Sequence, residues 1–208
     1  MPIKFLSRIF SPALIITSLL LAGCNEAPDA GPSEKSAKTA STAVSMTALA
    51  AQATGFTVGS QMSARTVYVF FDAQCPHCGV LWESAKPLKS QAKFVWIPVG
   101  ILNPSSTSQG ATILAAADPV AEMDRHEASM QARQGGISAA SSIDAQKASV
   151  AKNTELMTGF GFASIPVVVG MNAQTGALVT QEGSMPTAAL AKFLGLQVPA
   201  SQPGPAAK

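Results

Sequence analysis

Charged residues are scarce in this sequence: they make up 12% of its 208 residues, and Lys and Arg form no cluster. The 14 Lys and Arg residues include Lys4 and Arg8, which lie in a segment that we expect to be removed; the remaining 12 face 12 acidic residues. Nucleic-acid binding depends on clustered Lys and Arg that neutralise phosphates. The composition therefore argues against a nucleic-acid partner.

Cysteine and histidine are also scarce, with three and two residues. A structural zinc site takes four ligands. Only His77 and His126 could complete such a site with Cys75 and Cys78, and His77 lies between the two cysteines. No second C-x-x-C pair is present. A zinc site is therefore disfavoured, and we expect neither a metal nor a cofactor.

The pair Cys75 and Cys78 could also form a permanent structural disulfide. Such a bond would close a very small loop, and the chain-entropy model gives little stabilisation for so short a span. In an exported chain, where disulfides persist, the interpretation favoured over zinc and over a structural disulfide is a redox-active pair.

The N-terminal segment has the pattern of a secretory signal. Lys4 and Arg8 precede the apolar run "IFSPALIITSLLLAG", which is shorter than the roughly 20 apolar residues that a membrane-spanning helix needs. Its end, "LAGC", resembles the lipobox of bacterial lipoproteins, in which the cysteine is acylated. We expect residues 1–23 to be a lipoprotein signal peptide and Cys24 to be lipidated. The residue after this cysteine is Asn25. By resemblance to enterobacterial lipoprotein sorting, a residue other than Asp at this position favours the outer membrane. The alternative is an ordinary signal peptide that contains a cysteine.

Two segments are too polar and too poor in large apolar residues to build a core. Residues 24–45 are rich in Ala, Ser, Pro and charge, and we expect a flexible tether. Residues 198–208 are similar, and we expect a disordered tail. The globular domain is then predicted over residues 46–197.

Within that domain, β-branched and aromatic runs predict strands, and apolar residues at helical spacing predict helices. Helices are expected at 46–53, after Cys75 with a kink at Pro87, in about three stretches over 105–161 capped by residues such as Ser106 and Ser142, and from Thr187. Strands are expected at 55–60, 66–72, 93–101, 164–170 and 176–183, with a turn at 172–176 between the last two.

The spacing of the cysteines suits redox chemistry. If a helix begins near Pro76, Cys75 lies at its N-terminal edge, where free N–H groups and the helix dipole favour a thiolate and lower its pKa. Pro76 suits the first helical position because it needs no N–H partner there. Cys78 lies about one turn on, and His77 can add positive charge beside the sulfur. An ordinary loop histidine is the alternative for His77.

The stretch "FFDAQCPHCG" and the later "SIPVVV" resemble the thioredoxin superfamily, and within it the periplasmic DsbC/DsbG type. The resemblance implies an α/β, thioredoxin-like fold with a helical insertion at about 103–161, between the C-x-x-C half and the cis-proline half. It also implies that Pro166 is cis and lies opposite the cysteines, and that Ile165 and Pro166 bind an extended substrate segment.

Four features depart from that family. No segment corresponds to its N-terminal dimerisation domain, so we expect a monomer. Pro76-His77 matches the oxidant DsbA. Ile165 replaces the usual Thr, as in thioredoxin. Val69 stands where thioredoxin and DsbA hold a buried carboxylate, so proton transfer to Cys78 would need another route.

The resemblance implies a lipid-anchored, periplasmic thiol–disulfide oxidoreductase. Cys75 would be the nucleophile and Cys78 the resolving thiol, acting on cysteines of exported proteins. We favour a DsbG-like reductase or isomerase, kept reduced by a membrane electron donor of the DsbD type. The alternatives are a DsbA-like oxidase and a non-catalytic chaperone or assembly lipoprotein that uses the same cleft.

Replacement of Cys24 tests the anchor. Cys24→Ala removes the acylated residue, so the protein should move from the membrane fraction to the soluble periplasmic fraction. Cys75→Ala leaves "LAGC" intact and serves as the control that stays with the membrane. Retention of Cys24→Ala on membranes after a high-salt wash would contradict the lipoprotein assignment.

Overall fold

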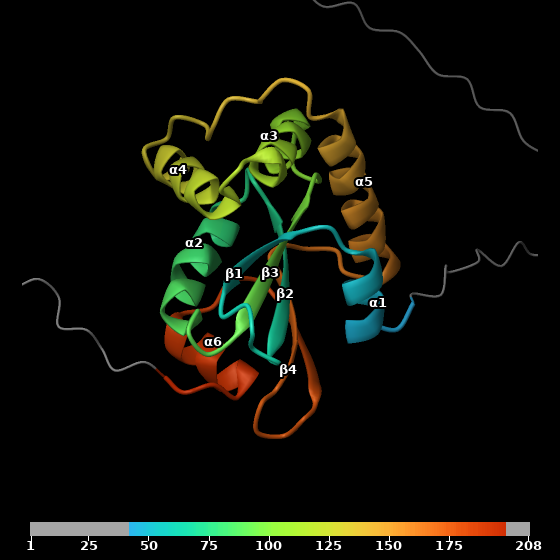
Figure 1. The fold of residues 1–208 in the computed structure, drawn as a ribbon, viewed down its shortest axis with the longest axis vertical. Coiled ribbons are helices and arrows are strands. Elements are labelled where there is room, and N and C mark those ends of the chain that lie inside the picture. Colours follow the sequence, from blue (N-terminus) through green and yellow to red (C-terminus); the bar gives the residue numbers. More distant parts are fainter. Residues whose placement is uncertain (1–41, 199–208) are drawn as a thin grey trace, which may run out of the picture. The chain divides into compact units, whose positions relative to one another are not determined.

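The computed structural model describes residues 42–198, in which five strands form one sheet of order β1-β3-β2-β4-β5 (Figure 1). The strands are β1 (Phe56–Gly59), β2 (Thr66–Asp72), β3 (Lys93–Val99), β4 (Val167–Met171) and β5 (Leu178–Glu182). The helices are α1 (Met46–Gln52), α2 (Pro76–Ala85), α3 (Pro104–Ala115), α4 (Pro119–Gln131), α5 (Asp144–Gly159) and α6 (Thr187–Leu194), with a 3-10 turn at Lys86–Leu88.

The central strand, β2, explains why its sequence is an almost unbroken apolar run. It pairs in parallel with β3 and antiparallel with β4, and every residue after Thr66 is buried. A strand covered on both faces has no solvent side to mark with polar residues. The pairing ends with Asp72 opposite Val99, which places the carboxyl ends of both parallel strands together.

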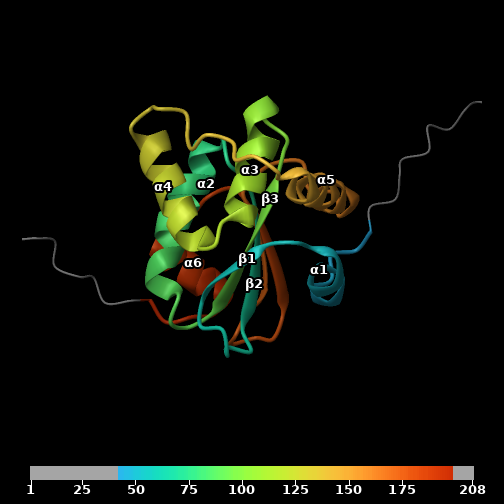
Figure 2. The ribbon, with the colours of Figure 1, turned by 45° about the horizontal axis from the view of Figure 1, so that its top comes forward.

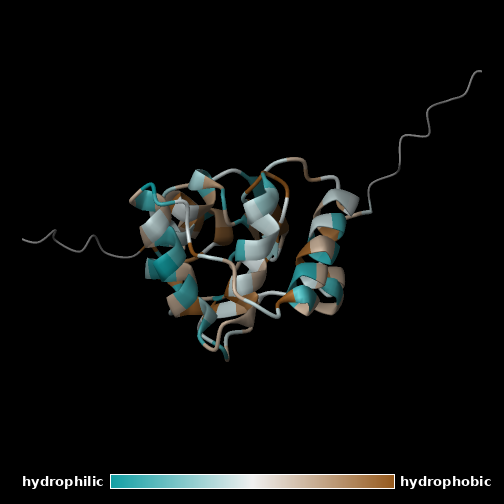
Figure 3. Ribbon diagram, turned by 90° about the horizontal axis from the view of Figure 1, so that it is seen from above, coloured by the Kyte–Doolittle hydropathy of each residue, from teal (hydrophilic) through white to brown (hydrophobic). Residues whose placement is uncertain are grey.

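Alternate side chains of β2 divide the core into two layers, because successive residues of a strand point to opposite faces of the sheet. Val67, Val69 and Phe71 pack with α2 and α6, whereas Tyr68 and Phe70 pack with α1 and α5. Figure 2 shows α1 and α5 on one side of the sheet and α2, α4 and α6 on the other. The helices carry both hydrophilic and hydrophobic residues along their length, as helices with one buried face do (Figure 3).

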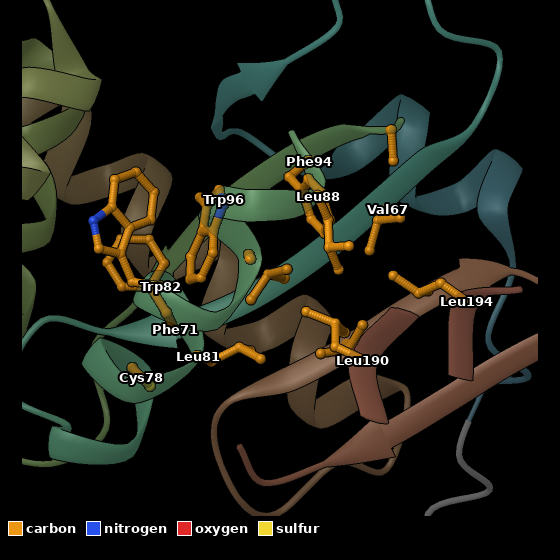
Figure 4. Packing of buried hydrophobic residues seen from close by; sticks show 14 of the residues in the cluster. Val67, Phe71, Cys78, Leu81, Trp82, Leu88, Phe94, Trp96, Leu190 and Leu194 are labelled. Carbon is orange, nitrogen blue, oxygen red and sulfur yellow. The ribbon is translucent and has the colours of Figure 1, made fainter. Parts of the chain in front are cut away.

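An aromatic cluster anchors α2 to the sheet. Trp82 of α2 meets Trp96 of β3 edge-on, with ring centroids 4.9 Å apart, and Phe71 meets Trp96 at 5.7 Å (Figure 4). The Trp82 indole N–H donates to Asp124 of α4 at 2.8 Å. Buried aromatic rings contribute large apolar areas, so this cluster fixes the helix that carries Cys78.

The expected insertion of helices is present. Three helices, α3, α4 and α5, lie between β3 and β4, and the predicted turn between β4 and β5 is closed by the Gly176 N–H donating to the Asn172 carbonyl at 2.8 Å. The α/β fold with a helical insertion is therefore confirmed.

Two predicted helix caps are wrong. Asn103 caps α3, and Ser106 is the third helical residue, whose hydroxyl accepts from the Asn103 N–H in a capping box. Ile143 precedes α5, and Ser142 has a φ of 57° outside the helix. Both serines lie within three residues of a real helix start, where sequence patterns place boundaries least well.

The predicted kink at Pro87 is also wrong. α2 ends at Ala85 and Pro87 lies in the 3-10 turn, because proline removes a helical hydrogen bond and clashes with the preceding turn. β3 stops at Val99 rather than residue 101, since the N–H groups of Gly100 and Ile101 donate to side chains instead. β4 begins only after Pro166, which has no N–H for the ladder.

At the N-terminal end of the described range, the Thr42 N–H donates to the Gly159 carbonyl at 2.8 Å, and Val44 packs against the α1–α5 layer. The rest of the expected tether, the signal segment 1–23, Cys24 and the tail beyond Val198 lie outside the described residues. Within residues 42–198, no helix has both the length and the apolar character needed to cross a membrane.

A buried amide joins the insertion to the sheet, and its removal should be costly. Asn153 of α5 is fully buried; it accepts from the Thr54 N–H at 2.9 Å and donates to the carbonyls of Thr54 and Pro98. Asn153→Ala should lower the free energy of unfolding by about 1–3 kcal/mol or more, because buried backbone groups lose their partners. Urea denaturation measures this, with the exposed neighbour Lys152→Ala as control. Equal stability of the two variants would contradict it.

Candidate active site

Cys75 and Cys78 lie at the start of α2. Cys75 is the N-cap residue, with extended backbone, and Pro76 is the first helical residue, as predicted. The Cys78 N–H donates to the Cys75 carbonyl at 3.0 Å. Cys75 keeps 6% of its surface exposed and Cys78 none, and both are free thiols. Only Cys75 can therefore meet a substrate sulfur without rearrangement.

Asp72 fixes the turn that leads from β2 to Cys75. Its side chain is fully buried; one oxygen accepts from the Gln74 N–H at 2.8 Å and the other from the N–H groups of Ile101 and Leu102 at 2.8 and 3.0 Å. Three backbone donors satisfy a carboxylate that would otherwise be costly to bury. The side chain joins the loop after β2 to the loop after β3.

His126 of α4 holds the same turn from the insertion. It is fully buried, its Nε2 lies 2.6 Å from the Ala73 carbonyl, and its Nδ1 accepts from the Ile137 N–H at 3.3 Å. A ring that donates from one nitrogen and accepts at the other is neutral, with its proton on Nε2. Burial lowers its pKa, which favours that form. Gly136, with φ of 88°, passes so close that a Cβ would overlap the ring.

Gln74, the residue before Cys75, forms a second link to the insertion. Its side chain donates to Gln109 and to the Gly135 carbonyl at 3.1 Å, and accepts from Asn103 at 3.2 Å. Gln109 donates in turn to Gly135 at 2.8 Å. The loop carrying the nucleophile is therefore held by polar contacts from α3 and from the segment after α4.

The loop before β4 lies beside Cys75. The Ile165–Pro166 peptide bond is cis, which confirms that prediction, and the Cys75 sulfur lies 4.0 Å from the Ile165 carbonyl. Ile165 is partly exposed whereas Pro166 is buried. Ile165 thus offers a backbone group next to the sulfur.

The two thiols have opposite electrostatics. A hydrogen bond from the Cys78 thiol, with smaller contributions from the N–H groups of Cys78 and His77 and the positive field of His77, lowers the pKa of Cys75 to about 6 despite its burial. Burial, and then the hydrogen bond to Cys75, raise the pKa of Cys78 strongly. Near neutral pH the pair holds one thiolate, on Cys75.

Glu127 was not anticipated from the sequence. This residue of α4 is 5% exposed, and its side chain has no hydrogen-bond or ion-pair partner among residues 42–198. Its carboxylate lies against α2 where Gly79 has no side chain; a Cβ there would overlap it. Burial, then the nearby charges of Glu83 and Cys75, raise its pKa to about 7. No local pattern distinguishes Glu127 from an ordinary surface carboxylate of a helix.

The structure brings six of the predicted site residues together: Cys75, Pro76, His77, Cys78, Ile165 and Pro166. The seventh, Cys24, lies outside the described range. Val69 is buried in the apolar layer beneath α2, and the carboxylates at the site come from Asp72 and Glu127 instead. In residues 42–198, no group of three potential ligands could hold a metal ion.

Comparison with known proteins finds two relatives that are thiol:disulfide interchange proteins. No family model matches the chain. It is 33% identical over 140 residues to the thiol:disulfide interchange protein DsbG of Pseudomonas aeruginosa, covering 66% of this chain and 54% of that protein. It is 31% identical over 110 residues to DsbG of Escherichia coli, covering 52% and 44%. The chain thus spans about half the length of these relatives.

A solved structure supports the fold. The catalytic domain of Proteus mirabilis ScsC aligns with a TM-score of 0.55 at 16% identity, over 72% of this chain and 96% of that domain. Identity this low bears on the fold alone, and it agrees with the five-stranded sheet and its helices.

The pKa of Cys75 should depend more on Cys78 than on His77, because the hydrogen bond from the Cys78 thiol is its largest cause. Cys78→Ala should raise the Cys75 pKa from about 6 toward 9.0, and His77→Ala should raise it less. The ultraviolet absorbance of the thiolate against pH, or the rate of alkylation, measures both. A larger shift in His77→Ala than in Cys78→Ala would show that the imidazole governs the thiolate.

Proposed function

We propose that this chain, a thioredoxin-superfamily protein of the DsbG type, is a periplasmic thiol–disulfide oxidoreductase that works in the reductase or isomerase direction. The observation that carries the proposal is the asymmetric thiol pair. Cys75 has a pKa of about 6 and some exposure, and it lies beside the fully buried Cys78. Such a pair supplies an attacking thiolate at neutral pH and retains a second thiol to release the product.

The reaction proceeds by two exchanges. The Cys75 thiolate attacks one sulfur of a substrate disulfide, a mixed disulfide forms, and the other substrate sulfur leaves as a thiolate that takes a proton from water. Cys78 then loses its proton and attacks the Cys75 sulfur, which gives the Cys75–Cys78 disulfide and a second substrate thiol. Two electrons pass from the protein to the substrate, so a donor must reduce the pair before the next turnover.

Substrate binding is assigned to the loop before β4. The Ile165 carbonyl, 4.0 Å from the Cys75 sulfur, is a backbone acceptor for an extended segment that pairs with this loop. Pro166, buried behind it, holds this backbone in place. His77 is exposed beside the sulfur and contributes positive charge to Cys75.

The setting that we propose follows from the N-terminal pattern. The signal-like residues 1–23 and Cys24 would place a lipid-anchored protein in the periplasm, at the outer membrane. Its substrates would be exported proteins with cysteines, and its reductant a membrane donor of the DsbD type. We also propose that the protein is a monomer, which sedimentation at micromolar concentration would test.

A DsbA-like oxidase is the second candidate, and one observation favours it. The lowered Cys75 pKa stabilises the reduced protein, and such stabilisation makes a dithiol pair more oxidising. The equilibrium reduction potential against glutathione, together with the redox state of the pair in cells, separates the two directions. A largely reduced pair in cells supports the reductase, and a largely oxidised one supports the oxidase.

Insulin reduction tests the activity. Cys75→Ser should abolish it, because the thiolate that attacks the substrate is gone. Cys78→Ser should also abolish turnover but should accumulate mixed disulfides with substrate, since nothing resolves them. Ser90→Ala, at an exposed position that lines neither the cysteine site nor the cleft beside it, is the matched control and should keep the activity. Activity in Cys75→Ser, or binding of unfolded protein without any turnover in the wild type, would remove the enzyme assignment and favour a chaperone.

A further inference from the structure

A cleft of about 430 Å³ lies beside the thiol pair, between α2 and α4. The two helices run next to each other on the same side of the sheet (Figure 1). Pro76, Val80 and Met130 give the cleft apolar walls, and Glu83 and Glu127 add two carboxylates. Pro76, which lines the cleft, directly follows Cys75 in the chain, so the cleft begins one residue from the nucleophile.

The charge in this cleft is unbalanced. Lys86, whose charge acts on Glu127, already bridges Glu83 at 2.7 Å and Asp124 at 2.8 Å. The Glu127 side chain forms no ion pair and no hydrogen bond with residues 42–198, although only 5% of the residue is exposed. The carboxylate oxygens of Glu127 are not fully enclosed, and Glu127 lines the cleft. The part of the side chain that remains exposed therefore faces the cleft.

A mainly apolar cleft that contains an unpaired carboxylate favours one kind of occupant. Lys and Arg bury their aliphatic stems along apolar surface and keep a cationic head for a polar partner. A cation would relieve the cost of burying the Glu127 charge, whereas an acidic side chain would be repelled.

We propose that the cleft between α2 and α4 receives a lysine or arginine side chain of the substrate, close in sequence to the cysteine that Cys75 attacks, and that Glu127 binds its cationic head. The stem packs on Pro76, Val80 and Met130. This assignment rests on the proposed function and adds a substrate class to it: disulfides flanked by basic residues.

The preference should depend on pH. The charged groups near Glu127 are Glu83 of α2, Lys86 of the 3-10 turn and the Cys75 thiolate. Its pKa of about 7 reflects burial first and then Glu83 and Cys75. Above this pH the carboxylate is ionised and binds a cation; below it the neutral acid loses most of that attraction. Selectivity for basic substrates should therefore rise with pH through neutrality.

The test compares the reduction of peptide disulfides that differ at one position. Lysine, norleucine or glutamate is placed in turn at each of the positions flanking the cysteine, and the reduced full-length protein supplies the thiols. At one position or more, the lysine peptide should react about tenfold faster than the norleucine peptide, equivalent to about 1.4 kcal/mol. The glutamate peptide should be the slowest.

Glu127→Gln should bring the lysine-to-norleucine ratio close to one. Glu122→Gln is the matched control: it removes a buried carboxylate of the same helix that pairs with Arg125 and does not line the cleft, so the ratio should persist. Because each ratio is taken within one protein, any change in Cys75 reactivity cancels. Should Glu127→Gln not fold, the wild-type ratio measured well above and well below the Glu127 pKa decides the matter.

Equal rates for lysine and norleucine peptides at every position, a ratio unchanged by Glu127→Gln, or a wild-type ratio independent of pH would overturn the cleft assignment while leaving the oxidoreductase intact. Failure to reduce any peptide, norleucine included, would instead overturn the proposed function.

Discussion

The site depends on one buried carboxylate, that of Asp72. It receives N–H groups from the loop after β2 and the loop after β3, at the end of two parallel strands that meet side by side. The first loop delivers Cys75 and the second delivers α3. Because a buried carboxylate is stable only while its oxygens are satisfied, this contact requires both loops to hold one arrangement. The position of Cys75 is thus set by the contact that Asp72 makes between the loops at the carboxyl ends of β2 and β3.

The helical insertion contributes residues that hold the loop carrying Cys75. His126, Gln109 and the carbonyl of Gly135 reach the two residues before Cys75. Buried polar networks of this kind favour a single arrangement, because any other leaves donors or acceptors without partners. The same insertion brings Glu127 against α2, so it supplies both the support of the nucleophile and the charge beside it.

The chemical difference between the thiols comes from their surroundings. Cys75 and Cys78 are the same residue type, three positions apart, yet the pKa of one is lowered and that of the other is raised. Cys75 lies at the N-terminus of α2, with hydrogen-bond donors around its sulfur. Cys78 is buried in the same core cluster as Trp82 and Phe71 (Figure 4). Cys75 is therefore the thiol that can attack as a thiolate, and Cys78 stays protonated until the second step.

Much of the fold follows from local pattern. The strand at 66–72 has the predicted bounds, the last helix begins at Thr187 as predicted, and the three helices of the insertion are present, because the apolar pattern of a segment follows from which residues are buried. Helix ends are less well marked: Ser106 carries a capping signal, but Asn103 lies at the start of α3 and takes that role. Pro87 indicates that the helix after Cys75 is interrupted, but the sequence does not distinguish a kink in that helix from its end.

For the site, the sequence by itself determined the C-x-x-C pair, its place at a helix start and the proline loop that faces it, since these depend on residues close together in the chain or on a recognisable motif. Only the tertiary structure decided the roles of Asp72, His126 and Glu127. His126, considered from the sequence only as a metal ligand, instead binds the Ala73 carbonyl 53 residues away. The burial of these three side chains and the charges around them come from elements distant in sequence. No local sequence pattern can therefore reveal their roles.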